Sequence, residues 1–132
     1  MISRKELRQI ARARLEDAQT LLNAGRYDGT IYLGGYVVEL ALKARICKTL
    51  KWSSFPQTRG EFQNYQSFKT HNLDVLLSLC GVEAKIKTKY LAEWSIIATW
   101  DPEARYNPTG SATKLDAESL VDAATELLRA LV

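Results

Sequence analysis

The sequence predicts an all-α protein, an antiparallel bundle of four main helices plus one or two short helices. Three observations lead to this prediction. Apolar residues recur every three or four positions near both ends of the chain, Ser and Thr stand where helices would begin, and one segment is apolar on nearly every side. The chain has no internal repeat and no linker-like tract, so we expect residues 1–132 to form a single domain.

The first helix is expected over residues 3–24. Its apolar face consists of residues that step by three or four along the chain: Leu7, Ala11, Leu15, Ala18 and Leu22. Ser3 and Glu6 have the spacing of a capping box, in which each side chain accepts a hydrogen bond from the backbone N–H of the other residue. Gly25 is expected to end this helix in the left-handed conformation.

The second helix is expected over residues 27–50, and it is apolar on all sides from Ile31 to Leu42. Such a helix lies at the centre of a bundle. A β-strand is the alternative, but the segment runs on into the good helix formers ELALKAR, which favours a helix. Gly34 and Gly35 each cost about 1 kcal/mol relative to Ala inside a helix. Their presence indicates close packing against another helix or against a second subunit.

The segment from residue 51 to residue 70 is the least regular part of the chain. The capping-box spacing of Thr58 and Glu61 predicts a short helix that starts at Thr58. Aromatic and basic residues also alternate here, a composition that suits single-stranded nucleic acid or a loop pinned over the core. A second short helix is expected from His71 to Gly81, a glycine that would end it.

Two further helices are expected in the last third of the chain. One covers residues 83–98, with apolar residues at Ile86, Tyr90, Trp94 and Ile97. The other covers residues 114–131, where Thr113 and Asp116 have the spacing of an N-terminal cap. Between these helices, residues 100–108 read WDPEARYNP, a corner with two prolines, two acids and an Arg-Tyr pair.

Composition and charge exclude several classes of protein. The net charge of +3 is too small to indicate nucleic acid binding by itself, although the first 26 residues hold six basic and three acidic residues. No apolar run approaches the roughly 20 residues that span a bilayer, and no secretory signal is present, so we expect a cytoplasmic protein without membrane contact. Cys47 and Cys80 have no metal-ligand spacing and read as buried free thiols. We therefore expect no metal and no cofactor.

Three features together resemble the HEPN domain family. The first is a helix pair joined at a Gly-Arg-Tyr-Asp corner, in LEDAQTLLNAGRYDGTIYLGGYVVELALKARI. The second is the helix start HNLDVLL, and the third is the Arg-Tyr pair of ARYNP before the last helix. The resemblance spans most of the chain, from about residue 13 to the last helix. It implies a four- or five-helix bundle that usually forms a homodimer and handles RNA or nucleotides.

Many HEPN proteins are metal-independent ribonucleases and toxins, often encoded beside a small nucleotidyltransferase that neutralises them. The resemblance therefore implies a nucleotidyltransferase-like protein as partner. Those enzymes carry an Arg followed four to six residues later by His, because Arg stabilises the phosphate and His transfers protons. Here Arg105 matches the Arg, but no His follows it at that spacing. The only His is His71, on a different predicted helix. We therefore expect a non-catalytic member.

Each candidate ligand-binding residue of the corner also has a structural interpretation. Arg105 offers a planar fork of donors to a phosphate, or it has a structural role in a salt bridge with Asp101 or Glu103 or in a bond to a helix C-terminal carbonyl. Trp100 and Tyr106 offer rings on which a base stacks, or they pack the corner onto the bundle.

Two further candidates lie outside the corner. His71 is a weak catalytic candidate together with Arg105 if the fold brings the two together, and otherwise a capping or packing residue. Arg4, Arg8 and Arg12 form one basic stripe on the first helix, for phosphate contact or simply for solvation.

These residues lead to one main hypothesis and two alternatives. The main hypothesis is a dimeric HEPN-like module that binds RNA or a nucleotide without cleaving it and works with a nucleotidyltransferase-like partner in a toxin–antitoxin or defence-type system. The first alternative is a protein-interaction bundle without nucleic-acid binding. The second is a metal-independent ribonuclease with an atypical site formed by Arg105 and His71.

Overall fold

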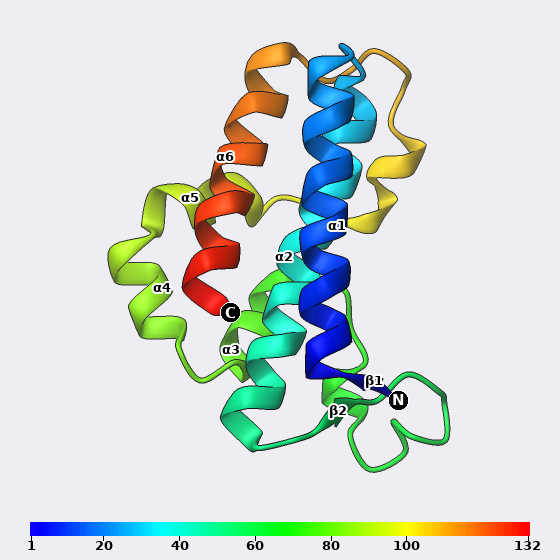
Figure 1. Ribbon diagram of the computed structural model, residues 1–132, viewed down its shortest axis with the longest axis vertical. Helices are drawn as coiled ribbons and strands as arrows, with labels where there is room; N and C mark the ends of the chain where they lie inside the picture. Colours follow the sequence, from blue (N-terminus) through cyan, green and yellow to red (C-terminus); the bar gives the residue numbers. More distant parts are fainter.

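The computed structural model describes residues 1–132 and is all-α, as the sequence predicts (Figure 1). Its elements are, in chain order, β1 (Ile2–Ser3), α1 (Arg4–Asn23), α2 (Tyr27–Leu50), β2 (Ser54–Phe55), the 3-10 helix η1 (Gln66–Phe68), α3 (Leu73–Leu79), α4 (Glu83–Lys89), α5 (Leu91–Ile97), the 3-10 helix η2 (Pro102–Tyr106) and α6 (Lys114–Leu131). The three long helices α1, α2 and α6 pack together, and the short helices cover their sides. No helix combines the length and the apolar character that crossing a membrane requires.

The first helix begins and ends as its sequence predicts. The Ser3 side chain accepts a hydrogen bond from the Glu6 N–H at 3.1 Å, and the Glu6 carboxylate accepts one from the Ser3 N–H at 2.9 Å. Gly25 has φ +75°, a left-handed conformation that other residues rarely adopt. The chain then reverses into α2, so that α1 and α2 form an antiparallel pair along the long axis of the molecule (Figure 1).

The central position of α2 follows from its apolar surface. Eleven of its residues are buried, and the helix packs against α1, α3 and α6. Gly34 lies against Leu120 of α6, and Gly35 lies against the indole of Trp100. The sequence left open whether these glycines pack against a neighbouring helix or a second subunit. Both contact elements of their own chain.

The helix predicted for residues 83–98 is divided in two. Tyr90 has φ −128° and ψ 32°, outside the helical range, and it separates α4 from α5. The bend keeps Ile86 of α4 and Trp94 of α5 in the core, with exposures of 0% and 4%.

The prediction of a short helix that starts at Thr58 is wrong. The backbone N–H groups and side chains of Thr58 and Glu61 do exchange hydrogen bonds, both at 3.2 Å. The chain nevertheless forms only turns there, because Gly60 and Asn64 are weak helix formers and the aromatic rings around them are drawn into one cluster. That cluster packs on the core and contains Trp52, Phe55, Phe62, Tyr65 and Phe68.

A small sheet fixes the same segment to the start of the chain. Ile2 pairs with Phe55 and Ser3 pairs with Ser54 in an antiparallel register. Phe55 is 1% exposed and belongs to a core of 25 buried residues. The interpretation of the aromatic residues as a pinned loop thus describes their packing.

Candidate functional site

Four polar or aromatic side chains form a stripe on α2, a helix that is otherwise largely buried. Tyr32, Tyr36, Glu39 and Lys43 are spaced by four, three and four residues, which places them on one face of the helix. We call these four residues the α2 stripe. The two residues proposed from the sequence as an Arg/His pair, His71 and Arg105, approach it from two different segments.

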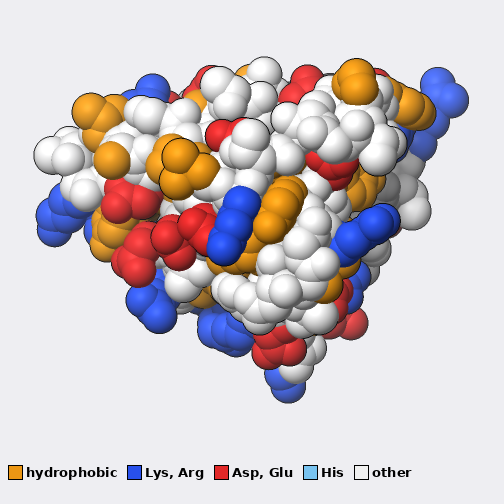
Figure 2. All heavy atoms as spheres, turned by 90° about the horizontal axis from the view of Figure 1, so that it is seen from above, with side chains coloured by type: hydrophobic (Ala, Val, Ile, Leu, Met, Phe, Trp, Pro, Cys, Tyr) orange, Lys and Arg blue, Asp and Glu red, His pale blue; other side chains and the backbone are white.

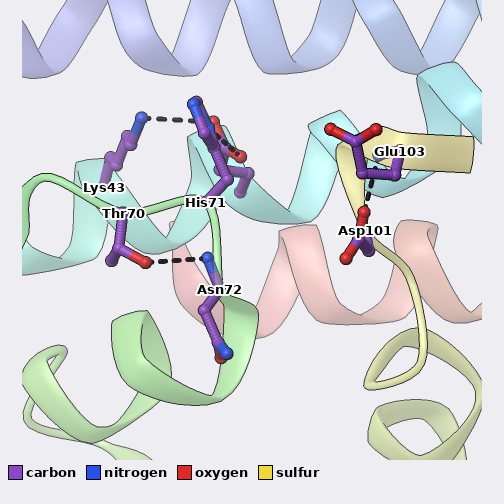
Figure 3. Close-up of polar contacts among 7 residues, drawn as sticks. Lys43, Thr70, His71, Asn72, Asp101 and Glu103 are labelled. Atoms are coloured by element: carbon purple, nitrogen blue, oxygen red, sulfur yellow. Dashed lines mark hydrogen bonds and ion pairs between the residues drawn. The ribbon is translucent and has the colours of Figure 1, made fainter. Parts of the chain in front are cut away.

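Glu39 is a buried carboxylate held by two basic side chains. It is 3% exposed, and its Oε2 lies 3.1 Å from Nζ of Lys43 while its Oε1 lies 2.9 Å from Nδ1 of His71. Figure 3 shows Lys43 and His71 pointing toward this carboxylate from α2 and from the loop before α3. Burial of a carboxylate is unfavourable unless it is paired, and this arrangement provides both partners.

The His71 ring remains accessible even though one of its nitrogens is engaged. Its side chain is 62% exposed. The cap of α3 is formed by the next residue, since the Asn72 side chain accepts a hydrogen bond from the Val75 N–H at 3.1 Å. Thr70 in turn accepts one from the Asn72 N–H at 3.0 Å (Figure 3). These turn contacts and Glu39 fix the ring while leaving Nε2 free of any protein partner.

Arg105 carries an exposed guanidinium group that is not paired with a carboxylate. Its guanidinium carbon lies 4.7 Å from the centre of the Tyr106 ring, and Tyr106 is itself 70% exposed. Interactions with Tyr106, and to a smaller extent with Tyr32 and Glu103, raise the pKa of Arg105. Asp101 accepts a hydrogen bond from the Glu103 N–H at 2.6 Å and so caps η2 instead of binding the guanidinium. The salt bridge considered from the sequence is not formed.

Tyr36 lies on the α2 stripe between Tyr32 and Glu39. Burial, the neighbouring Tyr32 and the Glu39 charge together raise the pKa of Tyr36 to about 12, against the opposing effect of the Arg105 charge. The centre of the Tyr36 ring lies 5.2 Å from the centre of the Tyr32 ring and 4.9 Å from that of the Trp100 ring, and both pairs meet edge to face. The α2 stripe therefore connects Arg105 at one end to the Glu39 carboxylate at the other.

His71 and Arg105 lie near the same helix face but make no contact with each other in the structure. His71 binds Glu39, and the nearest partners of Arg105 are Tyr106 and Tyr32. Direct cooperation of the two side chains on a single phosphate requires that the ligand itself bridge them.

Trp100 packs the corner onto the bundle. It is 7% exposed, and its ring fills the space above Gly35 and contacts Tyr36. Neither face of the indole is open for a base to stack on, which leaves Tyr106 as the accessible ring of the corner.

The basic stripe on α1 is only partly accessible. Arg12 is exposed, whereas Arg4 and Arg8 are half-buried, and Nε of Arg8 is shielded from solvent without a hydrogen-bond partner. None of the three forms an ion pair. The Arg4 charge instead reaches the buried Cys47, where it partly offsets the effect of burial that raises the pKa of this thiol.

The cavity beside the corner does not suit a phosphate. It has a volume of about 770 Å³ and lies between the first turns of α2, the end of α5, η2 and the first turns of α6. Four carboxylates line it and no Lys or Arg does. Figure 2, which views the molecule from the top end of Figure 1, shows acidic and basic side chains interspersed over this face, without a continuous basic patch. No group of three or more His, Cys, Asp or Glu side chains is arranged to hold a metal ion.

Three contributors to this site escaped the sequence reasoning. Tyr32 and Tyr36 lie in the segment predicted as an apolar central helix, and their spacing of four, three and four residues with Glu39 and Lys43 is the signal that places all four on one face. Asp28 accepts hydrogen bonds from the N–H groups of Gly110 and Ala112 at 2.6 and 3.0 Å, and so holds the end of the corner. No local pattern indicates a contact between residues so far apart in the chain.

Comparison with known proteins supports the family resemblance over the first part of the chain. Residues 5–60 match the HEPN domain family, a segment that contains α1, α2 and the loop through β2. No curated protein and no solved structure matches the chain. The resemblance of the first helix pair to HEPN domains is thus confirmed, and the matched segment includes the α2 stripe but neither His71 nor Arg105.

Proposed function

We propose that this protein is a non-catalytic HEPN-like module that binds RNA or a nucleotide through Arg105 and Tyr106. In this proposal it forms a homodimer and acts with a nucleotidyltransferase-like partner in a toxin–antitoxin or defence-type system. The HEPN match over residues 5–60 supports the general assignment. The binding of RNA or a nucleotide, the homodimer and the nucleotidyltransferase-like partner go beyond this match and are proposed here.

The observation that carries the proposal is the state of Arg105. Its guanidinium is exposed, stacked on the Tyr106 ring and free of any carboxylate partner. A guanidinium in this state presents its planar fork of donors to phosphate oxygens. The exposed Tyr106 ring is a platform for a base next to that phosphate, and a stacked base contributes about 1–3 kcal/mol.

A metal-independent ribonuclease is the second candidate, and one observation favours it. The buried Glu39 holds Nδ1 of the exposed His71, so Nε2 of the ring is oriented and accessible. A carboxylate in this position fixes the orientation of the imidazole ring and directs Nε2 toward a substrate on the open side. The missing contact between His71 and Arg105 and the departure from the family spacing favour binding without cleavage.

RNA binding with the purified protein tests both candidates. Fluorescence anisotropy of a labelled single-stranded 12-nucleotide RNA measures the affinity at low and at high salt, and ATP as competitor tests for nucleotide binding. We expect salt-sensitive binding that Arg105→Ala weakens about tenfold, because a charge-assisted contact contributes about 1.5–3 kcal/mol. Arg59→Ala is the matched control, since Arg59 is also exposed and has no acidic partner.

The same samples decide whether the RNA is cut. Cleavage in the presence of EDTA that disappears in both Arg105→Ala and His71→Ala establishes the ribonuclease. Intact RNA and no detectable binding at low salt refute both candidates and leave a protein-interaction bundle. Sedimentation at micromolar concentration tests the homodimer, which a mass near 14.9 kDa contradicts.

A further inference from the structure

The cavity between α2, α5, η2 and α6 has a character opposite to that of a phosphate site. We call it the α5–α6 groove and define it by Ile96, Asp101, Glu103, Leu115 and Asp116. Its volume of about 770 Å³ falls within the range of ligand sites in proteins, about 300–1,000 Å³. Its lining combines apolar side chains with carboxylates and contains no basic residue.

The carboxylates of the groove carry negative charge without a salt-bridge partner. Asp28, Asp101 and Asp116 accept hydrogen bonds from backbone N–H groups, and Glu103 has no side-chain partner. None of the four carboxylates forms an ion pair. Backbone hydrogen bonds keep a carboxylate ionised without neutralising it, so the groove repels phosphates and attracts Lys and Arg side chains.

Two large apolar side chains at the edge of the groove, which we call its lip, are exposed to solvent. Leu115 is 71% exposed and Ile96 is 40% exposed, while the buried Trp100 and Leu120 form part of the lining between them. Complete burial of an aliphatic side chain of this size is worth about 1.5–3 kcal/mol. A small cation inside the cavity would leave the lip exposed, whereas a segment of polypeptide laid across it would cover both side chains.

We propose that the α5–α6 groove docks a segment of another protein that carries an apolar residue flanked by Lys or Arg. The apolar residue enters between Ile96 and Leu115, and the flanking basic groups face Asp101, Glu103 and Asp116. The groove differs from the candidate RNA or nucleotide site in sign of charge and in residues. The proposal therefore does not depend on the proposed function.

Selection from a random 12-residue peptide display library, with the full chain as bait, tests the groove without a known partner. We expect enrichment of peptides with Lys or Arg on both sides of a Leu, Ile, Phe or Trp. Fluorescence anisotropy of the best peptide then measures the effect of two groove variants. Asp101→Asn/Glu103→Gln should weaken binding about tenfold, near the upper limit for two surface ion pairs. Leu115→Asp should weaken it at least about tenfold as the loss of a central apolar contact.

Matched controls separate the groove from the rest of the surface. Leu91→Asp places the same change on another exposed leucine, 58% exposed, that does not line the groove. Glu16→Gln/Asp17→Asn removes the same charge from α1. We expect both controls to bind the peptide like the wild type.

Several outcomes overturn the proposal. The first is a set of selected peptides that is not enriched in Lys or Arg. The second is the absence of any selected peptide that binds in the groove. The third is an equal loss of peptide affinity in the control variants and in the groove variants. A wild-type dimer that Leu115→Asp converts to a monomer also overturns it, because a second copy of the chain would then cover the groove.

Discussion

Replacement of Gly35 by Ala tests the contact that seats the corner on the central helix. A Cβ atom at this position would overlap the Trp100 indole at Cε2, Cδ2 and Nε1. The indole is rigid and 7% exposed, so it cannot yield by rotating a terminal group. The ring has to leave its place, or the corner has to move away from α2.

The expected magnitude follows from two opposing terms. Ala gains about 1 kcal/mol over Gly in helix propensity. Overpacking of a core usually costs about 1–3 kcal/mol, and the loss of a buried Trp side chain costs about 3–5 kcal/mol. The overlap with a rigid ring lies toward the higher cost, so Gly35→Ala should lower the free energy of unfolding by about 2–4 kcal/mol. The midpoint of thermal unfolding should fall by about 10 °C for a domain of this size.

Urea and thermal unfolding followed by circular dichroism measure this effect, with a matched glycine as control. At Gly29 an added Cβ would lie 3.1 Å from Cδ1 of Leu21, the flexible end of a side chain. Gly29→Ala should therefore change the stability by less than about 1 kcal/mol. In a Trp100→Leu background, Gly35→Ala should also cost less than about 1 kcal/mol, because its effect is coupled to the indole. Equal stability of Gly35→Ala and Gly29→Ala, or an equal cost of Gly35→Ala in both backgrounds, would show that the Trp100 indole does not limit the space at Gly35.

Two further predictions concern ionisable groups. The N–H groups of Gly110 and Ala112 lower the pKa of Asp28 below its ordinary value of 3.8, so its stabilising effect is complete above that value and is lost as the pH falls through the folded-state pKa. Asp28→Asn should therefore be less stable than the wild type at neutral pH, and the difference in urea unfolding should shrink in acid; a constant difference would contradict this. Burial raises the pKa of the Cys47 and Cys80 thiols. A thiol reagent should therefore react with them slowly in the native protein and at once in urea. Rapid labelling of the native protein would contradict this prediction.

Local signals in the sequence were sufficient for the long helices. The caps at Ser3 and Thr113 and the left-handed Gly25 depend on residues within one turn, and all three form as predicted. The errors arose where packing decides. The bend at Tyr90 follows from which side chains the core accepts, and local helix propensity carries no information on that choice. At Thr58 the capping-box spacing is present, but the weak helix formers Gly60 and Asn64 and the packing of the aromatic cluster outweigh it.

Some residues of the candidate site could be singled out from the sequence by type, but their arrangement could not. Arg105 and His71 stood out by type, yet the Glu39 partner of His71 lies 32 residues away in the sequence. The sequence therefore left open whether His71 caps a helix or meets Arg105, and the structure shows it bound to Glu39. The exposure of Arg105 was equally open, because Asp101 and Glu103 were near enough in sequence to pair with it.

The corner that carries Arg105 is held at both ends by the first half of α2. Trp100 fixes one end over Gly35, and Asp28 fixes the other through two N–H groups located 82 and 84 residues later in the chain. Contacts between such distant residues form late in folding relative to local ones, so we expect the corner to dock after the α1–α2 pair has formed a surface for it. Arg105 consequently reaches its position only in the completely folded chain. Any local opening of the first half of α2 withdraws the guanidinium, and the stability of this helix thereby sets the fraction of molecules that present it.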